Sequence, residues 1–310
     1  MSDTALIAID WGTTTARAWR FDSAGQLLGS RKAPLGIKQV RDGRFDLALA
    51  QLLGDWNART APMIACGMIG SRQGWLEAPY VDCPASLAAL ADRVVRTRVE
   101  RLTIVPGIAT IDAAGVPDVM RGEETQLLGA VDPGEHGMLA VLPGTHSKWA
   151  RVDHGRVVDF TTFMTGELYA VLLEHSMLGR LAAGDPDAIA QDAFSRGAAR
   201  GLAAGELSHD IFGARTLVLA GMLSPDDVAD WLSGLLIGRE IRAAREWARR
   251  AGADPGAVRI IGDGPLPARY ELALADAGIV AETAGPDAAA HGLWRIALNA
   301  GLVTAALQPS

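Results

Sequence analysis

The chain has 310 residues, of which 49% are hydrophobic and 21% are charged, and its formal net charge is −7. This length and composition predict two globular domains of ordinary core size. The negative charge argues against nucleic acid as the main partner, because binding to a phosphate backbone needs a basic face.

The N-terminal sequence MSDTALIAIDWG lacks the basic segment and apolar run of a signal peptide. No apolar run reaches the roughly 18 residues that a membrane-spanning helix needs. Cys66 and Cys83 have no CxxC spacing, and no His, Cys and Asp residues have the spacing of a metal site. These features predict a cytoplasmic protein with two free thiols and no membrane partner.

Short apolar runs alternate with helical patterns along the chain, which predicts an α/β fold. In the first half, we expect strands at residues 5–9, 17–21, 26–31, 64–66 and 102–105, and helices at 45–56 and 122–131. In the second half, we expect strands at residues 139–142, 147–152, 157–160 and 258–261, and helices at 165–173, from 224 toward 249, and at 287–303. Thr165 and Ser224 are the expected N-caps of two of these helices.

The two halves can be aligned with each other. LIAIDWGT at residues 6–13 corresponds to MLAVLPGT at 138–145. In each half, a strand is followed by a Gly-Thr turn, a second strand, an Asp/Gly turn and a third strand. A match of this length is uncommon by chance, so the sequence predicts a duplicated three-strand unit, one in each lobe.

The two Gly-Thr turns are candidate phosphate-binding hairpins. Gly12 and Gly144 allow the backbone to approach a phosphate closely, and the neighbouring hydroxyls are hydrogen-bond donors, while Asp10 at a strand end is placed to hold Mg²⁺ through water. No GxxxxGK[ST] motif is present in the chain. For either hairpin alone, an ordinary structural turn is the simpler interpretation, whereas the pair favours phosphate binding.

Phosphoryl transfer to an alcohol also needs a group that accepts the hydroxyl proton. Glu123 and Glu124, at a predicted helix start, are the candidates. Acids are common in the first turn of a helix because they complement its dipole. Spacing alone therefore favours the structural role for these two residues.

Several blocks of sequence carry a wider resemblance. They run in order over nearly the whole chain: AIDWGTTTARAW, CGMIGSRQGW, VMRGEETQLLGA, LPGTHSKW, DFTTFMTGEL, EHSMLG, WLSGLLIGREI and ARYELAL. With these blocks, the chain resembles the 2-dehydro-3-deoxygalactonokinase family of the actin, sugar-kinase and Hsp70 superfamily. The resemblance implies an α/β fold of two actin-like, ribonuclease H-like lobes with an ATP cleft between them.

The implied reaction is ATP- and Mg²⁺-dependent phosphorylation of the 6-hydroxyl of 2-dehydro-3-deoxy-D-galactonate, in galactonate breakdown. Residues 1–135 would form the N-terminal lobe with the first phosphate hairpin and the sugar site. Residues 136–310 would form the C-terminal lobe with the second hairpin and the adenosine site, and the last helix could pack back on the N-terminal lobe.

The resemblance also assigns roles to single residues. Asp10, Gly12, Thr13 and Thr14 match the first phosphate segment, with Asp10 as the expected metal-binding residue. Gly144, Thr145 and His146 match the second phosphate segment. Gly262 and Gly264 match the adenosine segment, although the Gly-Gly pair often found there is absent. Related kinases carry an Asp base where this chain has Glu123 and Glu124, and the position nearer the helix start favours Glu123.

The implied substrate is a sugar acid, so its carboxylate needs a cation. The candidates are Lys38, Arg72, Arg121 and Lys148, and Arg121 and Lys148 lie inside distinctive blocks. Lys148 is equally a candidate for the ATP phosphates. Gly70, Ser71 and Tyr80 are the remaining candidates for the sugar site, and a plain turn beneath the lobe interface is an equal alternative for the first two.

Two other functions stay open on the sequence alone. One is a kinase for another sugar acid, and the other is a non-catalytic nucleotide switch, because a fold does not by itself define a function. A base candidate beside a phosphate hairpin favours the enzyme. The expected partner is a small-molecule sugar acid rather than nucleic acid or membrane, and a homodimer stays open.

Overall fold

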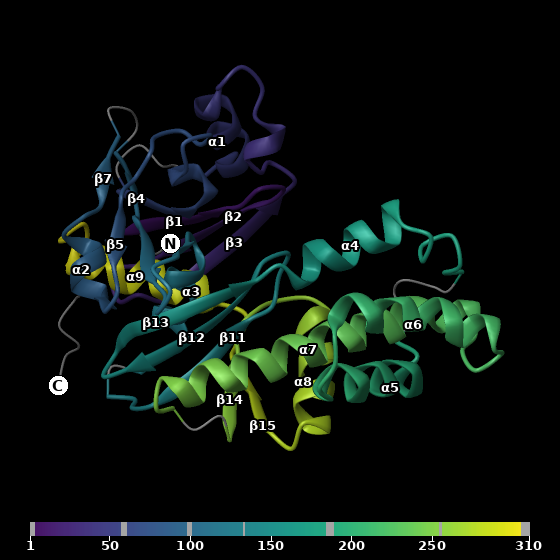
Figure 1. Cartoon of the computed structure of the whole chain (residues 1–310). Coiled ribbons are helices and arrows are strands. Elements are labelled where there is room, and N and C mark those ends of the chain that lie inside the picture. The colour runs from purple at the N-terminus through teal and green to yellow at the C-terminus, as the bar shows by residue number, and fades with distance from the viewer. Residues whose placement is uncertain are drawn as a thin grey trace. The chain divides into compact units, whose positions relative to one another are not determined.

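The computed structural model describes residues 4–56, 61–97, 101–132, 134–183, 189–253 and 256–304 (Figure 1). Contacts divide the chain into two compact units. The first comprises Met1–His136, Val152–Asp159 and Gly285–Ser310, and the second comprises Gly137–Arg151 and Phe160–Ala284. None of the helices in the described residues is long and apolar enough to cross a membrane.

The main sheet of the first unit has the order β3-β2-β1-β4-β8-β7. Its strands are β1 (Leu6–Trp11), β2 (Ala16–Phe21), β3 (Leu27–Ala33), β4 (Met63–Gly67), β7 (Val95–Arg96) and β8 (Leu102–Ile104). A smaller sheet has the order β10-β9-β5, from β5 (Tyr80–Asp82), β9 (Gly107–Ile111) and β10 (Pro117–Met120). Helices of this unit are α1 (Phe45–Leu53), α2 (Leu87–Ala91), α3 (Glu123–Ala130) and α9 (Ala288–Asn299), with short 3-10 turns at Ile37–Gln39 and Met68–Gly70.

The sheet of the second unit has the order β15-β14-β11-β12-β13. Its strands are β11 (Met138–Leu142), β12 (Ser147–Asp153), β13 (Arg156–Phe163), β14 (Ala257–Ile260) and β15 (Val280–Thr283). The first residues of β13 belong to the first unit and pair there with β6 (Ala85–Ser86). The helices are α4 (Thr165–His175), α5 (Gln191–Leu202), α6 (Leu207–Leu219), α7 (Val228–Arg250) and α8 (Leu266–Asp276), with a 3-10 turn at Pro225–Asp227.

The predicted duplication is confirmed. The order β3-β2-β1-β4-β8 in one sheet corresponds strand by strand to β13-β12-β11-β14-β15 in the other. In the first sheet, β4 is parallel to both β1 and β8, and in the second, β14 is parallel to both β11 and β15. The repeat therefore covers five strands, two more than the sequence alignment of the halves indicates.

Each sheet is covered by apolar helices. Ile7, Ile9 and Trp11 alternate along β1 and share a core cluster with the buried side of α1. In the second unit, α5, α7 and α8 share a cluster with β11, β12 and β14, and Trp149 and Tyr270 are its largest buried side chains. The strands with a period-2 apolar pattern and the helices with a period-3.6 pattern therefore pack their apolar faces together in two separate cores.

The last helix, α9, belongs to the first unit, where it lies beside α3 and α2 (Figure 1). Two glycines bring α3 and α9 into backbone contact: a Cβ on Gly129 would lie 1.9 Å from the Ala288 carbonyl oxygen, and one on Gly292 would lie 1.9 Å from that of Thr125. Arg295 donates to the carbonyl oxygens of Leu128 at 2.5 Å and Val131 at 2.7 Å, at the end of α3. This packing holds α3, whose first turn carries the predicted base.

One predicted N-cap is wrong. Met164 occupies the N-cap position of α4, and Thr165 is its first helical residue. The Thr165 hydroxyl forms a side-chain hydrogen bond with Glu240 instead of capping its own helix. The second predicted cap is confirmed, because the Ser224 hydroxyl accepts a hydrogen bond from Asp226 N at 3.3 Å.

Candidate active site

The first hairpin joins β1 to β2 through residues 12–15. Gly12 N donates to the Thr15 carbonyl at 2.9 Å and closes the turn. The segment that follows β3 packs against it: Gly36 N donates to Thr14 O and Lys38 N donates to Thr13 O, each at 3.1 Å. Since a Cβ on Gly36 would lie 2.3 Å from Thr14 N, only glycine allows this approach. The turn is held in one shape while Thr14 stays exposed.

Asp10 lies at the end of β1, where strand register gathers its neighbours. Arg17 is its antiparallel partner on β2, and Cys66 is its parallel partner on β4. Arg17 donates to Asp10 Oδ2 at 2.7 Å, and the Cys66 thiol lies 3.9 Å from Oδ1. Burial and the nearby carboxylates raise the pKa of Cys66 well above its usual value, so the thiol stays protonated. Asp10 is therefore mostly buried and already paired with one cation.

Two glycines connect this strand end to the first turn of α3. Gly67 has φ 88° and Gly122 has φ 106°, in the region that favours glycine. A Cβ on Gly67 would lie 3.1 Å from Asp10 Oδ1, and a Cβ on Gly122 would lie 3.1 Å from the Gly67 Cα. The start of α3 thus packs directly beside Asp10.

The two predicted base candidates have different environments. Glu124 is fully buried, and its carboxyl group accepts hydrogen bonds from Gly122 N at 2.6 Å and the Thr125 hydroxyl at 2.8 Å. Burial, followed by the charge of Glu123, raises the pKa of Glu124 to about 8. Glu123 is half-buried, and its carboxylate accepts from Arg121 N at 3.1 Å. Of the two, Glu123 has the carboxylate that solvent reaches.

Arg121 lies just before α3 and contacts two other predicted sugar-site residues, Gly70 and Tyr80. Its Nη2 donates to Ala78 O at 2.8 Å, and its guanidinium carbon lies 4.4 Å from the Tyr80 ring centroid. A Cβ on Gly70 would lie 3.0 Å from Arg121 Nη1. Nε and Nη1 are buried and have no hydrogen-bond partner among the described residues, so two donors of this cation remain for a ligand. Ser71, after the 3-10 turn, donates its hydroxyl to Met68 O at 2.7 Å.

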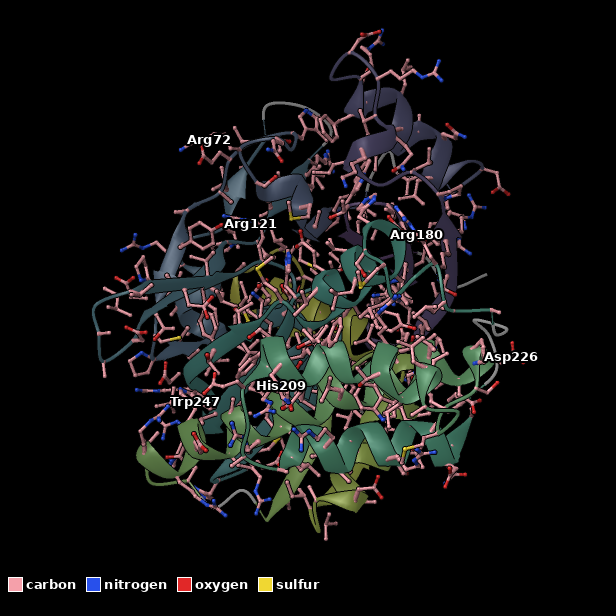
Figure 2. The ribbon with its side chains drawn as sticks, turned by 45° about the vertical axis from the view of Figure 1, so that its right-hand side comes forward. Arg72, Arg121, Arg180, His209, Asp226 and Trp247 are labelled. Atoms are coloured by element: carbon pink, nitrogen blue, oxygen red, sulfur yellow. The ribbon has the colours of Figure 1, made fainter. Side chains whose placement is uncertain are left out.

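The other predicted carboxylate-binding cations lie elsewhere. Arg72 is 88% exposed beside Glu77, and Figure 2 shows it at the edge of the molecule, while Arg121 lies deeper. Lys38 is exposed next to the first hairpin. Lys148 is buried in β12, where its ammonium group donates to the Thr162 hydroxyl at 2.7 Å. Of the four, Arg121 is the one that the structure brings to Tyr80 and Gly70.

The second hairpin joins β11 to β12 and is covered by the start of α4. Glu167 N donates to Thr145 O at 3.0 Å, and the side chains of His146 and Glu167 are hydrogen-bonded to each other. A Cβ on Gly166 would lie 2.5 Å from Gly144 O. The start of α4 thus packs on the second hairpin, as the segment around Gly36 packs on the first hairpin.

A small pocket opens beside this hairpin within the second unit. Its lining is mostly apolar, with Leu236 and Ile237 of α7 and Leu266 of α8 among its residues. The remaining lining residues are Gly144, Thr165, Gly166, Tyr169, Ser233, Arg269 and Tyr270. Gly262, one of the predicted adenosine positions, lies next to the hairpin, since its Cβ would be 3.8 Å from Pro143 Cδ. Gly264, with φ 85°, makes the turn into α8.

A buried polar cluster lies under the same hairpin. Glu240 of α7 is 2% exposed and accepts from Trp149 Nε1 at 2.7 Å and from the Tyr270 hydroxyl at 2.9 Å. The Tyr270 hydroxyl also lies 2.8 Å from Ser147 Oγ. Burial raises the pKa of Glu240 to about 7, against the opposing effect of these hydrogen bonds. Sequence reasoning missed this cluster, although a lone Glu inside a buried helix pattern is a usable signal.

Folding brings together one group of possible metal ligands that no sequence spacing indicates. His136, Asp153 and His154 have ligand atoms within 4.8 Å of one another. Their side chains are 64%, 47% and 67% exposed, and the two rings meet edge to face at 4.0 Å. Folding brings them together across a turn, so no local spacing reveals them.

Comparison with known proteins identifies the family of this chain. The family model of 2-keto-3-deoxy-galactonokinase matches residues 10–296. The 2-dehydro-3-deoxygalactonokinase of Escherichia coli (strain K12) is 36% identical over 294 residues, which cover 94% of this chain and 97% of the relative. A crystal structure from Sinorhizobium meliloti assigned to 2-dehydro-3-deoxygalactonokinase matches with TM-score 0.85 and 37% identity, over 94% of this chain and 98% of that one.

At lower identity, a ligand-bound xylulose kinase from Lactobacillus acidophilus matches with TM-score 0.50 and 11% identity, over 96% of this chain and 90% of that one. That likeness concerns the fold alone. The predicted fold class, the two-lobed actin-like fold of sugar kinases, is confirmed. The family match extends over both units, from the first hairpin to α9. The chain belongs to the 2-keto-3-deoxy-galactonokinase family.

Proposed function

We propose that this protein transfers the γ-phosphoryl group of ATP to the 6-hydroxyl of 2-dehydro-3-deoxy-D-galactonate. The observation that supports this most is the start of α3, where Glu123 lies beside the strand end that carries Asp10. Membership of a kinase family supplies the reaction class. A positioned carboxylate next to a phosphate-binding turn is what phosphoryl transfer to an alcohol requires.

Glu123 is our proposed general base. Its carboxylate is half-buried near a helix N-terminus, where the dipole favours negative charge. Glu124 holds its proton up to a pKa of about 8 and is fully buried. It is therefore the weaker acceptor at neutral pH, and its bonds to Gly122 N and Thr125 shape the first turn instead.

The substrate carboxylate is proposed to bind Arg121. Its buried Nε and Nη1 have no acceptor among the described residues, and a guanidinium forms charge-assisted hydrogen bonds with a carboxylate. Gly70 leaves room beside Nη1, and Tyr80 covers the guanidinium face. Ser71 is a further candidate for a sugar hydroxyl, because its oxygen keeps lone pairs that can accept.

The phosphates of ATP are proposed to bind both hairpins, through Gly12, Thr13 and Thr14 in the first unit and Gly144, Thr145 and His146 in the second. Lys148 is buried against Thr162, so we propose that it contributes charge beneath the second hairpin. The apolar pocket beside Gly144 is the proposed nucleoside site, with Gly262 and Gly264 at the turn into α8.

Mg²⁺ is the proposed metal, and it would neutralise phosphate charge when bound with ATP. Asp10 would hold it. The carboxylate already accepts from Arg17 at 2.7 Å, which fits contact through water better than direct ligation, because Mg²⁺ keeps several waters. We also propose that the sugar site lies in the first unit and the adenosine site in the second.

An ADP-release assay coupled to NADH oxidation tests the function. The panel contains 2-dehydro-3-deoxy-D-galactonate, its C4 epimer 2-dehydro-3-deoxy-D-gluconate, and D-galactose, which has no carboxylate. We expect the highest kcat/KM with the galactonate derivative and little turnover of galactose, with ³¹P NMR placing the phosphate on C6. Preference for the epimer would indicate another sugar acid, and nucleotide binding without turnover of any compound would indicate a nucleotide switch.

A further inference from the structure

The buried carboxylate of Glu240 is used by none of the roles proposed above. It lies in the middle of α7, which packs between α5 and the sheet of the second unit (Figure 1). Its neighbours Ile237 and Ile241 are part of an apolar cluster, where an aliphatic side chain would fit. Burying a carboxylate is costly unless hydrogen bonds replace its water, so its partners indicate what it does.

Those partners come from three other elements. Trp149 of β12 donates its indole N–H to Glu240 at 2.7 Å, and Tyr270 of α8 donates its hydroxyl at 2.9 Å. The hydroxyl of Thr165, at the start of α4, also forms a side-chain hydrogen bond with Glu240, and Ser147, at the start of β12, is linked to Glu240 through the Tyr270 hydroxyl. One carboxylate thus connects α7 to α4, α8 and β12.

Apart from Trp149, each residue of this network is attached to the second hairpin or to its pocket. Ser147 directly follows residues 143–146, which form the hairpin. Thr165 precedes Gly166 and Glu167, whose backbone packs on Gly144 and Thr145. Thr165 and Tyr270 both line the pocket beside Gly144.

The hydrogen-bond directions form one chain. The Tyr270 hydroxyl has a single hydrogen and donates it to Glu240, so at 2.8 Å it accepts the hydrogen of Ser147. Ser147, Tyr270 and Glu240 are all almost completely buried. Fully satisfied buried networks of this kind rigidify the elements that they join.

We propose that Glu240 is a positioning residue for the nucleotide site: through Tyr270, Ser147 and Thr165 it holds the second hairpin and the start of α4 in the shape that takes the ATP phosphates. The nucleotide part of this proposal rests on the proposed function. Glu240 touches neither ATP nor substrate and acts through the hairpin.

Tyr270→Phe is the test variant, because it keeps the ring in the core and removes only the hydroxyl between Glu240 and Ser147. We expect KM for ATP and Kd for ADP to rise about fivefold to tenfold, which corresponds to the loss of one buried hydrogen bond. KM for the sugar acid should not change. In hydrogen-exchange mass spectrometry without nucleotide, peptides covering residues 143–147 and 164–168 should exchange faster.

Glu240→Gln should have a larger effect of the same kind, because an amide offers one acceptor oxygen to the donors that converge there. If this variant does not fold, Tyr270→Phe decides the matter alone. The matched control is Asp210→Asn, since Asp210 is a buried carboxylate of the same unit held by Arg200 and Arg239. Asp210 lies on α6 and is not one of the proposed binding residues. The Asp210→Asn variant should lower Tm but leave KM for ATP and the exchange of residues 143–147 unchanged.

Equal changes in KM for ATP in Asp210→Asn and Tyr270→Phe would overturn the proposal, because Glu240 would then support only general stability. Unchanged exchange at residues 143–147 in Tyr270→Phe would also overturn it. The exchange measurement needs no turnover. If the wild-type protein phosphorylates no member of the substrate panel while Tyr270→Phe loosens the hairpin, the proposed function fails and the positioning role stands.

Discussion

Gly67 and Gly122 meet so closely that a Cβ on Gly122 would lie 3.1 Å from the Gly67 Cα. Gly67 ends β4 and Gly122 is the N-cap of α3. Both have positive φ, so side chains are excluded at this contact by space and by backbone conformation. The contact places the first turn of α3 beside the Asp10 carboxylate, and three predictions about catalysis follow from it.

Glu123→Gln should lower kcat by about 10²–10⁴-fold, the usual range for loss of a general base. KM for ATP should change little, since the carboxylate faces the acceptor hydroxyl in our proposal. Glu124→Gln is the matched control: its carboxyl group already holds a proton below a pKa of about 8, so an amide replaces it with little change in charge. Steady-state kinetics of both variants decides the assignment. Near wild-type turnover in Glu123→Gln, with loss in Glu124→Gln, would transfer the role to Glu124.

Asp10→Asn should raise the Mg²⁺ concentration needed for half-maximal rate. The amide has lost the negative charge that attracts the metal, and it also leaves Arg17 without the carboxylate that accepts at 2.7 Å. Titration of the rate with Mg²⁺ at fixed ATP measures the effect. Asp46→Asn is the control, because Asp46 is an exposed carboxylate of the same unit paired with Arg44. An Mg²⁺ dependence like that of the wild type would remove Asp10 from the metal-binding role.

Arg121→Met should lower kcat/KM for the sugar acid by about 10–100-fold, the effect of losing a hydrogen-bonded charge. Methionine keeps an unbranched side chain against Tyr80 but has no donor for a carboxylate. Arg72→Met removes an exposed guanidinium from the same unit and should have wild-type kinetics. The loss in Arg121→Met should vanish for D-galactose, which has no carboxylate. An equal loss for both sugars would mean that Arg121 supports the fold only.

The hairpins could be predicted from sequence because each is local. Strand, turn and strand follow one another within about twenty residues, and Gly with Thr at the turn is visible directly. The order of strands around β1 and β11 extends this repeat to distant strands. The pairing of Asp10 with Cys66 depends on the register between β1 and β4, which the local pattern of either strand leaves open.

The long-range contacts that hold the site residues in place could not be predicted from local sequence. Arg295 caps the end of α3 from 167 positions further along the chain, and the closely packed glycines Gly129 and Gly292 look like ordinary helix residues in sequence. The pocket lining combines side chains from α4, α7 and α8. Thr165 was expected to cap α4 because its type suits an N-cap, but its hydroxyl is taken by Glu240 on another helix. In each of these cases, tertiary contacts between distant parts of the chain determine the structure.

The free energy of unfolding should decrease as pH rises, because Glu124 then loses its proton. Its pKa is raised from 4.5 to about 8 in the folded state, mainly by burial. The folded state therefore holds the proton more tightly than the unfolded state between these values, and the free energy of unfolding decreases as pH rises. The maximal slope is about 1.4 kcal/mol per pH unit for one group.

Urea unfolding of wild type and Glu124→Gln from pH 5 to pH 8 isolates this effect, because the other carboxylates contribute equally to both proteins. The difference should shift in favour of the variant as pH rises, since glutamine does not ionise. A constant difference across this range would mean that Glu124 has an ordinary pKa in the folded state.

Gly292→Ala should destabilise the first unit by about 1–3 kcal/mol, the usual effect of overpacking a close contact. The added Cβ would lie 1.9 Å from the Thr125 carbonyl oxygen, which is backbone and cannot rotate away. Helix α3 must then shift relative to α9, and Glu123 moves with it, so kcat should fall together with stability. Gly285→Ala is the matched control, because its Cβ meets no atom within 4 Å in the described residues and its φ is not in the glycine region. Urea unfolding and kcat of both variants test this, and a Gly292→Ala protein with wild-type kcat would show that α9 does not position the base.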